Sequence, residues 1–169
     1  MDIYDDLLQK EKQMIFLDMD GVLADWEKTA RELVGENWKE EVEKPNWGGL
    51  YNYPDLFARL DPMEDALELY DACVSISGAH RFVQILTALP NRAHFKDAAR
   101  HKIEWARKYI HPNIRVNFGP RAQDKQYHYM DGDVLIDDKQ LNIDQWRAKG
   151  GLGILHTSAR ESIILLTSR

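Results

Sequence analysis

The feature that most constrains the fold is an alternation of short apolar segments with longer segments of helical pattern. The apolar segments lie at 14–17, 82–87, 114–118, 134–136 and 152–156, and the main helical segments lie at 92–109 and 141–149. Apolar runs of this length predict strands buried on both faces. Strands that alternate with helices predict a parallel sheet covered on both sides. We therefore expect an α/β fold, a Rossmann-like three-layer parallel sheet.

The helical segment at 92–109 carries a single predicted core-facing stripe. Its members recur at spacings of three and four: Phe95, Ala99, Lys102, Ile103, Ala106 and Ile110. A short terminal helix is expected after residue 156, and a short helix or arm at 1–13.

Residues 26–77 differ from the rest of the chain. Charged helical stretches at 27–34 and 63–70 flank an aromatic segment at 45–54 that contains glycine and proline. This pattern predicts a small, mainly helical insertion at 26–77, which leaves 1–25 and 78–169 as the core.

Composition excludes several functional classes. The formal net charge of −6 argues against nonspecific binding of duplex nucleic acid, which needs a basic surface. The longest apolar runs are too short to span a membrane. A single cysteine, Cys73, excludes an internal disulfide and is typical of a cytoplasmic setting. We interpret Cys73 as a buried structural thiol, and we place the six histidines, none spaced like a zinc set, on the surface or in loops.

Acidic side chains follow two of the predicted strands. Asp18 and Asp20 follow the first, and the pair Asp137 and Asp138 follows the fourth, while Thr87 ends the second. Because parallel strands end at one edge of a sheet, where ligands bind, these groups are expected to converge. Converging carboxylates repel one another unless a proton or a divalent cation such as Mg²⁺ lies between them. The competing interpretation is that the first aspartates only cap a following helix.

Two carboxylates at such a site can divide the work of phosphate-ester hydrolysis. One can attack phosphorus as a nucleophile. The other can protonate the leaving oxygen and then deprotonate water. Gly21 permits the tight turn that brings backbone groups near a phosphate.

The segment 16–27, Phe-Leu-Asp-Met-Asp-Gly-Val-Leu-Ala-Asp-Trp-Glu, resembles the first motif of the haloacid dehalogenase superfamily, and in particular of the 5'(3')-deoxyribonucleotidase family. The resemblance implies a Mg²⁺-dependent phosphatase with a cap inserted after the first strand. Asp18 would be the nucleophile and Asp20 the acid/base. Thr87 would donate to the phosphate, and Lys125 would offset negative charge.

The family's remaining features map onto this sequence with one departure. The family usually carries a second hydroxyl after the threonine, but this chain has Ala88, so one phosphate contact is missing or supplied elsewhere. Lys102 is a weaker phosphate-contact candidate, with a surface position as the equal alternative. The implied metal ligands are Asp18, Asp20, Asp137 and Asp138, the last two assigned jointly.

The insertion supplies the expected walls of a substrate pocket. Trp26 lies where the family places an aromatic residue against the base, and Trp47 and Phe57 are candidate further walls; the alternative is that these rings form the core of the insertion itself. The expected substrate is a (deoxy)ribonucleoside monophosphate, with the deoxy preference resting on resemblance alone. The oligomeric state is open, a homodimer included. The expected substrate-binding residues are Asp20, Trp26, Trp47, Phe57, Thr87, Ala88 and Lys125.

Three other functions remain open at the level of sequence. The chain could be a phosphatase for another small metabolite, such as a sugar phosphate. It could be a receiver-like module that accepts a phosphoryl group without turnover, although the Asp20 position and the aromatic insertion argue against this. It could also be a degenerate nucleotide-binding scaffold. The presence of all four family motifs, with Ala88 as the one departure, argues against this.

Overall fold

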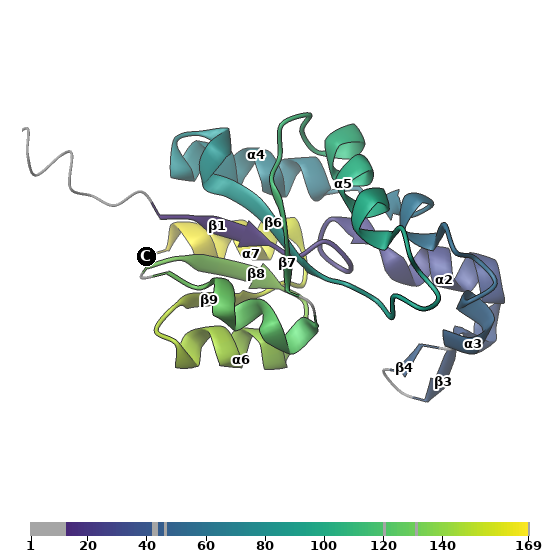
Figure 1. The fold of residues 1–169 in the computed structure, drawn as a ribbon. Helices are drawn as coiled ribbons and strands as arrows, with labels where there is room; N and C mark the ends of the chain where they lie inside the picture. The colour runs from purple at the N-terminus through teal and green to yellow at the C-terminus, as the bar shows by residue number, and fades with distance from the viewer. Residues whose placement is uncertain (1–12, 42–43, 46, 120, 131, 169) are drawn as a thin grey trace, which may run out of the picture.

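The computed structural model describes residues 13–41, 44–45, 47–119, 121–130 and 132–168, so nearly all of the arm expected at 1–13 lies outside the described residues. Its centre is a five-stranded sheet in the order β7-β6-β1-β8-β9, with every neighbouring pair parallel (Figure 1). The strands are β1 Ile15–Leu17, β6 Val83–Ala88, β7 Val116–Gly119, β8 Val134–Asp137 and β9 Leu152–Leu155. The predicted α/β parallel sheet is confirmed.

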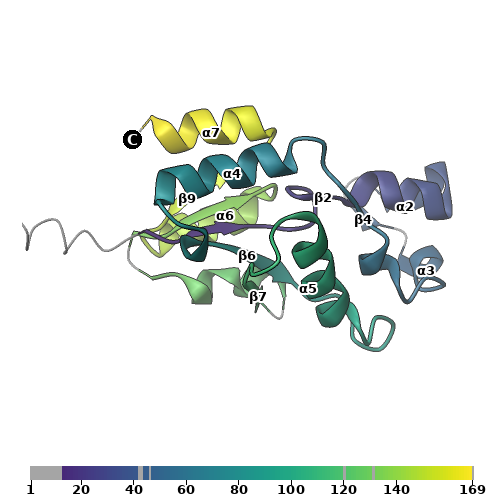
Figure 2. The ribbon, with the colours of Figure 1, turned by 90° about the horizontal axis from the view of Figure 1, so that it is seen from above.

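Helices cover both faces of this sheet, which gives the expected three layers. Successive side chains of a strand point to opposite faces. Ile15 and Leu17 belong to the buried cluster that contains residues of α4 (Ala66–Ser77) and α7 (Ala159–Thr167). Phe16 points the other way and packs edge-on against Trp146 of α6 (Gln140–Ala148), with ring centroids 5.7 Å apart. Figure 2 shows α4 and α7 together on one side of the sheet.

Helix α5 (Ala98–Tyr109) begins later than the sequence pattern predicts. The residues before it form turns, and the Asn91 side chain accepts a hydrogen bond from the Ala93 amide at 2.9 Å, which competes with helical pairing. The buried stripe is also shifted, because Trp105 is anchored by donating to the Leu60 carbonyl at 2.7 Å. The residues that α5 buries are Ala98, His101, Lys102, Trp105 and Ala106.

One histidine corrects the expectation that all six lie on the surface or in loops. His101 and His156 are both buried, but His156 lies in the loop after β9. His101 lies on α5, and the Nδ1 atom of His156 is 2.8 Å from the Ser162 hydroxyl. Burial lowers the pKa of His156, so its ring stays neutral. Cys73 is buried as expected, and burial raises the pKa of its thiol to about 12.

The chain between β1 and α4 extends beyond the carboxyl ends of the strands (Figure 1). An antiparallel pair, Ala24–Pro62 and Asp25–Asp61, joins its two ends. Helix α2 starts after Asp25, whose side chain accepts from the Lys28 amide at 3.1 Å. The elements between β1 and α4 are β2 Ala24–Asp25, α2 Trp26–Val34, η1 Glu36–Trp38, β3 Lys39–Glu41, β4 Lys44–Pro45, α3 Trp47–Leu50, η2 Leu56–Ala58 and β5 Asp61–Pro62.

The division into a core and an insertion at 26–77 stays a prediction. Within that range, α4 lies against the sheet, where it contacts α7 and β6.

Two short elements complete the fold, η3 His80–Phe82 and η4 Ala122–His128. Throughout the described part of the chain, every helix is too short or too polar to cross a bilayer.

Candidate active site

Strand register places the predicted acidic residues side by side. Leu17 pairs with Ile136 and with Ile85, so the residues that follow β1 and β8 emerge at one edge of the sheet. The Asp18 amide continues this pairing by donating to the Ile136 carbonyl at 2.9 Å. The carboxyl ends of β1, β6 and β8 therefore converge as expected.

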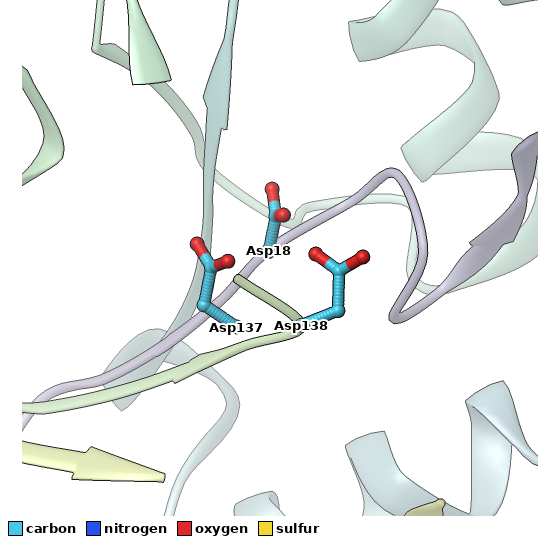
Figure 3. Close-up of side chains that lie close together, drawn as sticks. All are labelled: Asp18, Asp137 and Asp138. Atoms are coloured by element: carbon cyan, nitrogen blue, oxygen red, sulfur yellow. The ribbon is translucent and has the colours of Figure 1, made fainter. Parts of the chain in front are cut away.

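Three carboxylates gather at this edge. Oxygen atoms of Asp18, Asp137 and Asp138 all lie within 4.8 Å of one another, and Figure 3 shows the three side chains rising on the same side. Burial and the neighbouring charges of Asp137 and Asp138 raise the pKa of Asp18 to about 8, although Lys125 opposes this. Burial and Asp137 raise the pKa of Asp138 to about 6. The cluster therefore favours a bound proton or cation.

The two carboxylate oxygens of Asp18 have different surroundings. Oδ1 accepts from the Met19 amide at 2.8 Å and lies 2.7 Å from the Lys125 ammonium. Oδ2 receives no hydrogen bond from the residues that the structure describes. One oxygen is thus fixed while the other is open, which is the arrangement that a carboxylate nucleophile needs.

The structure distinguishes Asp137 from Asp138, which the sequence left joint. Asp137 is fully buried, and its oxygens accept from Lys125 (2.6 Å), from the Asn142 side chain (2.9 Å) and from the Lys139 amide (2.8 Å). Asp138 is exposed as a residue, although its carboxylate is partly enclosed where it leans over Gly21, and an added Cβ on Gly21 would collide with it. The carboxylate has a hydrogen bond only from the backbone amide of Asp138 itself among the described residues. Asp138 is therefore the better placed of the two to reach an ion.

Lys125 lies beneath the cluster as an almost fully buried cation. Its ammonium group on η4 bridges Asp18 (2.7 Å) and Asp137 (2.6 Å). Burial disfavours the ammonium form, but the charges of Asp18 and Asp137 outweigh burial and hold the pKa of Lys125 above its usual value. Lys125 therefore offsets part of the negative charge of the cluster.

Lys102 corrects the alternative of a surface position, because its side chain is buried. Its ammonium group donates to Asp20 (2.6 Å), to the Thr87 hydroxyl (2.8 Å) and to the Ala88 carbonyl (3.0 Å). It also lies 4.7 Å from the ring centroid of Phe57. The Thr87 hydroxyl accepts from Lys102, so its own proton remains available to a phosphate oxygen. Asp20 is held here, apart from the three-carboxylate cluster, and its Oδ1 is buried without a partner among the described residues.

A cavity of about 610 Å³ adjoins these groups. Asp20, Gly21, Ala88, Lys102 and Asp138 belong to its lining, whereas Asp18, Thr87 and Lys125 do not and are buried. Its aromatic walls are Trp26, Trp38, Trp47 and Phe57.

The three predicted aromatic residues come together in these walls. Trp26 stacks on Phe57, with ring centroids 5.6 Å apart and planes 16° from parallel, and its ring lies 5.4 Å from that of Trp47. Trp26 and Phe57 are thus too close for a base to enter between them, and a base must use a ring face that opens to the cavity. The rings pack together and also line the cavity, and their role as walls of a substrate pocket stays a prediction.

Sequence reasoning missed several lining residues. Glu27, Arg121 and Lys139 lie around the cavity, and Asn142 fixes Asp137 from below. Trp38 was recognised only as one of the aromatic residues of the insertion. No sequence signal marks Arg121 or Asn142, whereas Lys139 adjoins the Asp137–Asp138 pair.

Comparisons with known proteins agree with the fold. A hydrolase from Streptococcus pneumoniae TIGR4 superposes with a TM-score of 0.55 at 13% sequence identity, covering 92% of this chain and 98% of that one. A β-phosphoglucomutase candidate from Thermotoga maritima gives a TM-score of 0.50 at 16% identity, with 91% and 98% covered. No curated protein sequence matches the chain significantly.

At these identities the two structures show a shared fold, the parallel sheet at whose carboxyl edge Asp18 and Asp20 lie in this chain. The family model described as "5' nucleotidase, deoxy (Pyrimidine), cytosolic type C protein" matches residues 12–165. The chain belongs to this family and is a phosphatase of the 5'-nucleotidase type. The resemblance recognised in segment 16–27 is confirmed.

Proposed function

We propose that the protein hydrolyses (deoxy)ribonucleoside monophosphates to nucleoside and phosphate, in the manner of a 5'(3')-deoxyribonucleotidase, with Mg²⁺ as cofactor. The observation that carries this proposal is that the Asp18 carboxylate, with one oxygen free of hydrogen bonds from described residues, adjoins an aromatic-walled cavity lined by Asp20, Gly21 and Asp138. The family supports a nucleotide substrate, and its cytosolic type supports a cytoplasmic location. We also propose that the segment between β1 and α4 acts as the cap, while a homodimer stays a prediction.

The carboxylate cluster fits a hard divalent cation. Mg²⁺ prefers oxygen ligands and retains several waters, so Asp18 and Asp138 can hold it with few protein contacts. Burial, together with repulsion from Asp137 and Asp138, raises the pKa of Asp18, and a bound cation would offset both effects. If Asp20 also binds the metal as predicted, it must do so through a group other than the carboxylate oxygen that Lys102 holds. Bound there, Mg²⁺ would supply charge neutralisation for the phosphate and for Asp18.

The proposed mechanism assigns the chemistry to side chains of this chain. The open oxygen of Asp18 attacks phosphorus, which gives an aspartyl-phosphate and releases the nucleoside oxygen. Asp20 gives that oxygen a proton and then takes one from the water that hydrolyses the aspartyl-phosphate. Thr87 donates to a phosphate oxygen, and Lys125 holds Asp18 in place. Lys102, tied to Asp20, Thr87 and the Ala88 carbonyl, supplies a cation beside the position where the family usually has a second hydroxyl.

Mg²⁺ is expected to raise the thermal midpoint of the protein, and more at pH 8 than at pH 5.5. The pKa of Asp18 is raised from 3.8 to about 8 without metal, so the folded protein binds a proton there that the unfolded chain releases. Metal-free stability therefore falls as pH rises from about 4 to about 8. Mg²⁺ must displace that proton at low pH, which weakens its stabilising effect. Differential scanning fluorimetry at both pH values measures this difference.

Asp138→Asn is the test variant for this metal effect, and Asp144→Asn, at an exposed position of α6, is its control. Asp138→Asn should lose most of the Mg²⁺-induced shift, whereas Asp144→Asn should keep it. Equal shifts in the two variants would remove Asp138 from the proposed metal site.

Trp26→Ala is expected to raise KM for nucleoside monophosphates by about 5- to 150-fold, because base–aromatic stacking is worth roughly 1–3 kcal/mol. The KM for a small non-aromatic phosphate ester should stay within about 3-fold. A panel of nucleoside monophosphates, sugar phosphates and glycerol phosphate, assayed with Mg²⁺ for both proteins, measures this split. A wild-type preference for a sugar phosphate would overturn the nucleotidase proposal, and absence of turnover on the whole panel would favour the receiver-like module.

A further inference from the structure

A second cavity, of about 430 Å³, lies at the opposite end of β6 from the active site. Val83, the first residue of β6, forms part of it, whereas Thr87 and Ala88 end the strand beside the phosphatase site. A strand of six residues separates its end Cα atoms by about 17 Å. No residue lines both cavities. The lining of the second cavity consists of His80, Arg81, Val83, Gln84, His111, Asn113 and Arg115.

Two stacked imidazole rings form one part of this lining. The rings of His80 and His111 lie 4.3 Å apart between centroids, with planes 21° from parallel. The buried Tyr70 ring packs near both, at 5.9 Å from His80 and 6.0 Å from His111. The stack is therefore fixed from beneath by a core residue of α4.

Hydrogen bonds set which ring nitrogens carry protons. The Asn113 amide donates to His111 Nδ1 at 3.2 Å, so that nitrogen presents a lone pair and Nε2 carries the hydrogen. The Tyr70 hydroxyl lies 3.0 Å from His80 Nδ1, and burial with the nearby Asp71 raises the pKa of Tyr70 to about 12. When the Tyr70 hydroxyl donates to that Nδ1, His80 carries its hydrogen on Nε2, and both rings keep an N–H donor that no described residue uses.

Two guanidinium groups supply positive charge to the same cavity. Arg81 and Arg115 are exposed, and neither forms an ion pair with a residue that the structure describes. No acidic residue belongs to the lining, and the formal charge of the whole chain is −6. Two unpaired arginines with imidazole and amide donors in one hollow of an acidic protein form a local anion-attracting surface.

We propose that this second cavity binds a phosphate group, held by Arg81 and Arg115 and by the Nε2–H donors of His80 and His111. Arginine suits this role because its planar fork matches two phosphate oxygens, and imidazole N–H groups add directed donors. The ligand is either free inorganic phosphate or the phosphate of a nucleotide. Because the cavity is separate from Asp18, the site is independent of the proposed nucleotidase activity.

The test follows the Cε1–H signals of His80 and His111 by NMR during titration with inorganic phosphate, in EDTA and at constant ionic strength. Without metal, the three carboxylates at Asp18 repel phosphate, so the active site contributes little. Both signals should shift saturably. A parallel titration with a deoxynucleoside triphosphate separates the sources: tighter binding identifies a nucleotide ligand, and equal or weaker binding identifies free phosphate.

The variant Arg81→Gln/Arg115→Gln should weaken phosphate binding at least 10-fold and leave Mg²⁺-dependent turnover unchanged. Its matched control is Lys149→Gln/Arg160→Gln, which removes two exposed positive charges at α6 and α7 and should bind phosphate like the wild type. His80 and His111 signals that do not move would overturn the proposal. So would equal binding by both double variants, or a shift that sodium chloride reproduces at the same ionic strength.

Discussion

Asp18→Asn is expected to reduce turnover by about 10⁴-fold or more with any nucleoside monophosphate that the wild type hydrolyses. An amide oxygen is a poor nucleophile, and loss of an enzyme's nucleophile costs on the order of 10⁶-fold in well-studied cases. The substitution acts on the reacting group itself, because Oδ2 of Asp18 is the atom that would attack phosphorus. Steady-state release of inorganic phosphate, with enzyme at high concentration to extend the range, measures the loss.

The fold should survive this substitution. The amide oxygen of the variant can still accept from the Met19 amide and from Lys125, and one repelling charge leaves the cluster. We therefore expect the metal-free thermal midpoint at pH 8 to stay equal or to rise. Glu161→Gln, at an exposed position of α7, is the control for the removal of one acidic charge. Wild-type turnover by Asp18→Asn would show that the nucleophile assignment is wrong.

The parallel sheet was predictable because strand burial on both faces leaves a strong signal. Segments such as 14–17 and 134–136 are apolar throughout, as a strand covered by helices on both sides requires. The convergence of Asp18 and Asp137 followed from this, because parallel register fixes which residues share an edge. Helix starts were less predictable, since the Asn91 turn before α5 depends on a local side-chain hydrogen bond.

The particular contacts of several site side chains could not be predicted, because these contacts join distant segments of the chain. Lys102 meets Asp20 across 82 positions in the chain, and nothing around Lys102 in the sequence marks this contact. The difference between Asp137 and Asp138 likewise depends on Asn142 and Lys125, which come from separate elements. The burial of His156 results from packing of the final helix, where Ser162 supplies its partner.

Lys125→Met is expected to lower the free energy of unfolding by about 3–5 kcal/mol in the absence of metal, because removing one member of a buried ion pair strands the other charge. Lys125 touches Asp18 and Asp137 at once, so its loss leaves the fully buried Asp137 without its cation and removes the charge that opposes protonation of Asp18. Turnover should fall as well, since Asp18 Oδ1 loses the cation that fixes it. Urea unfolding at pH 7 with EDTA, and phosphate release with Mg²⁺, measure the two effects.

A second substitution separates charge from packing. In Lys125→Met/Asp137→Asn the total charge of the cluster returns to its original value, so most of the lost stability should return, while turnover should stay low because Asp18 still lacks its cation. Lys149→Met, an exposed lysine at the end of α6, is the control and should change neither quantity. If the double variant is no more stable than Lys125→Met alone, packing around the lysine stem accounts for the loss. The electrostatic role assigned to Lys125 would then be wrong.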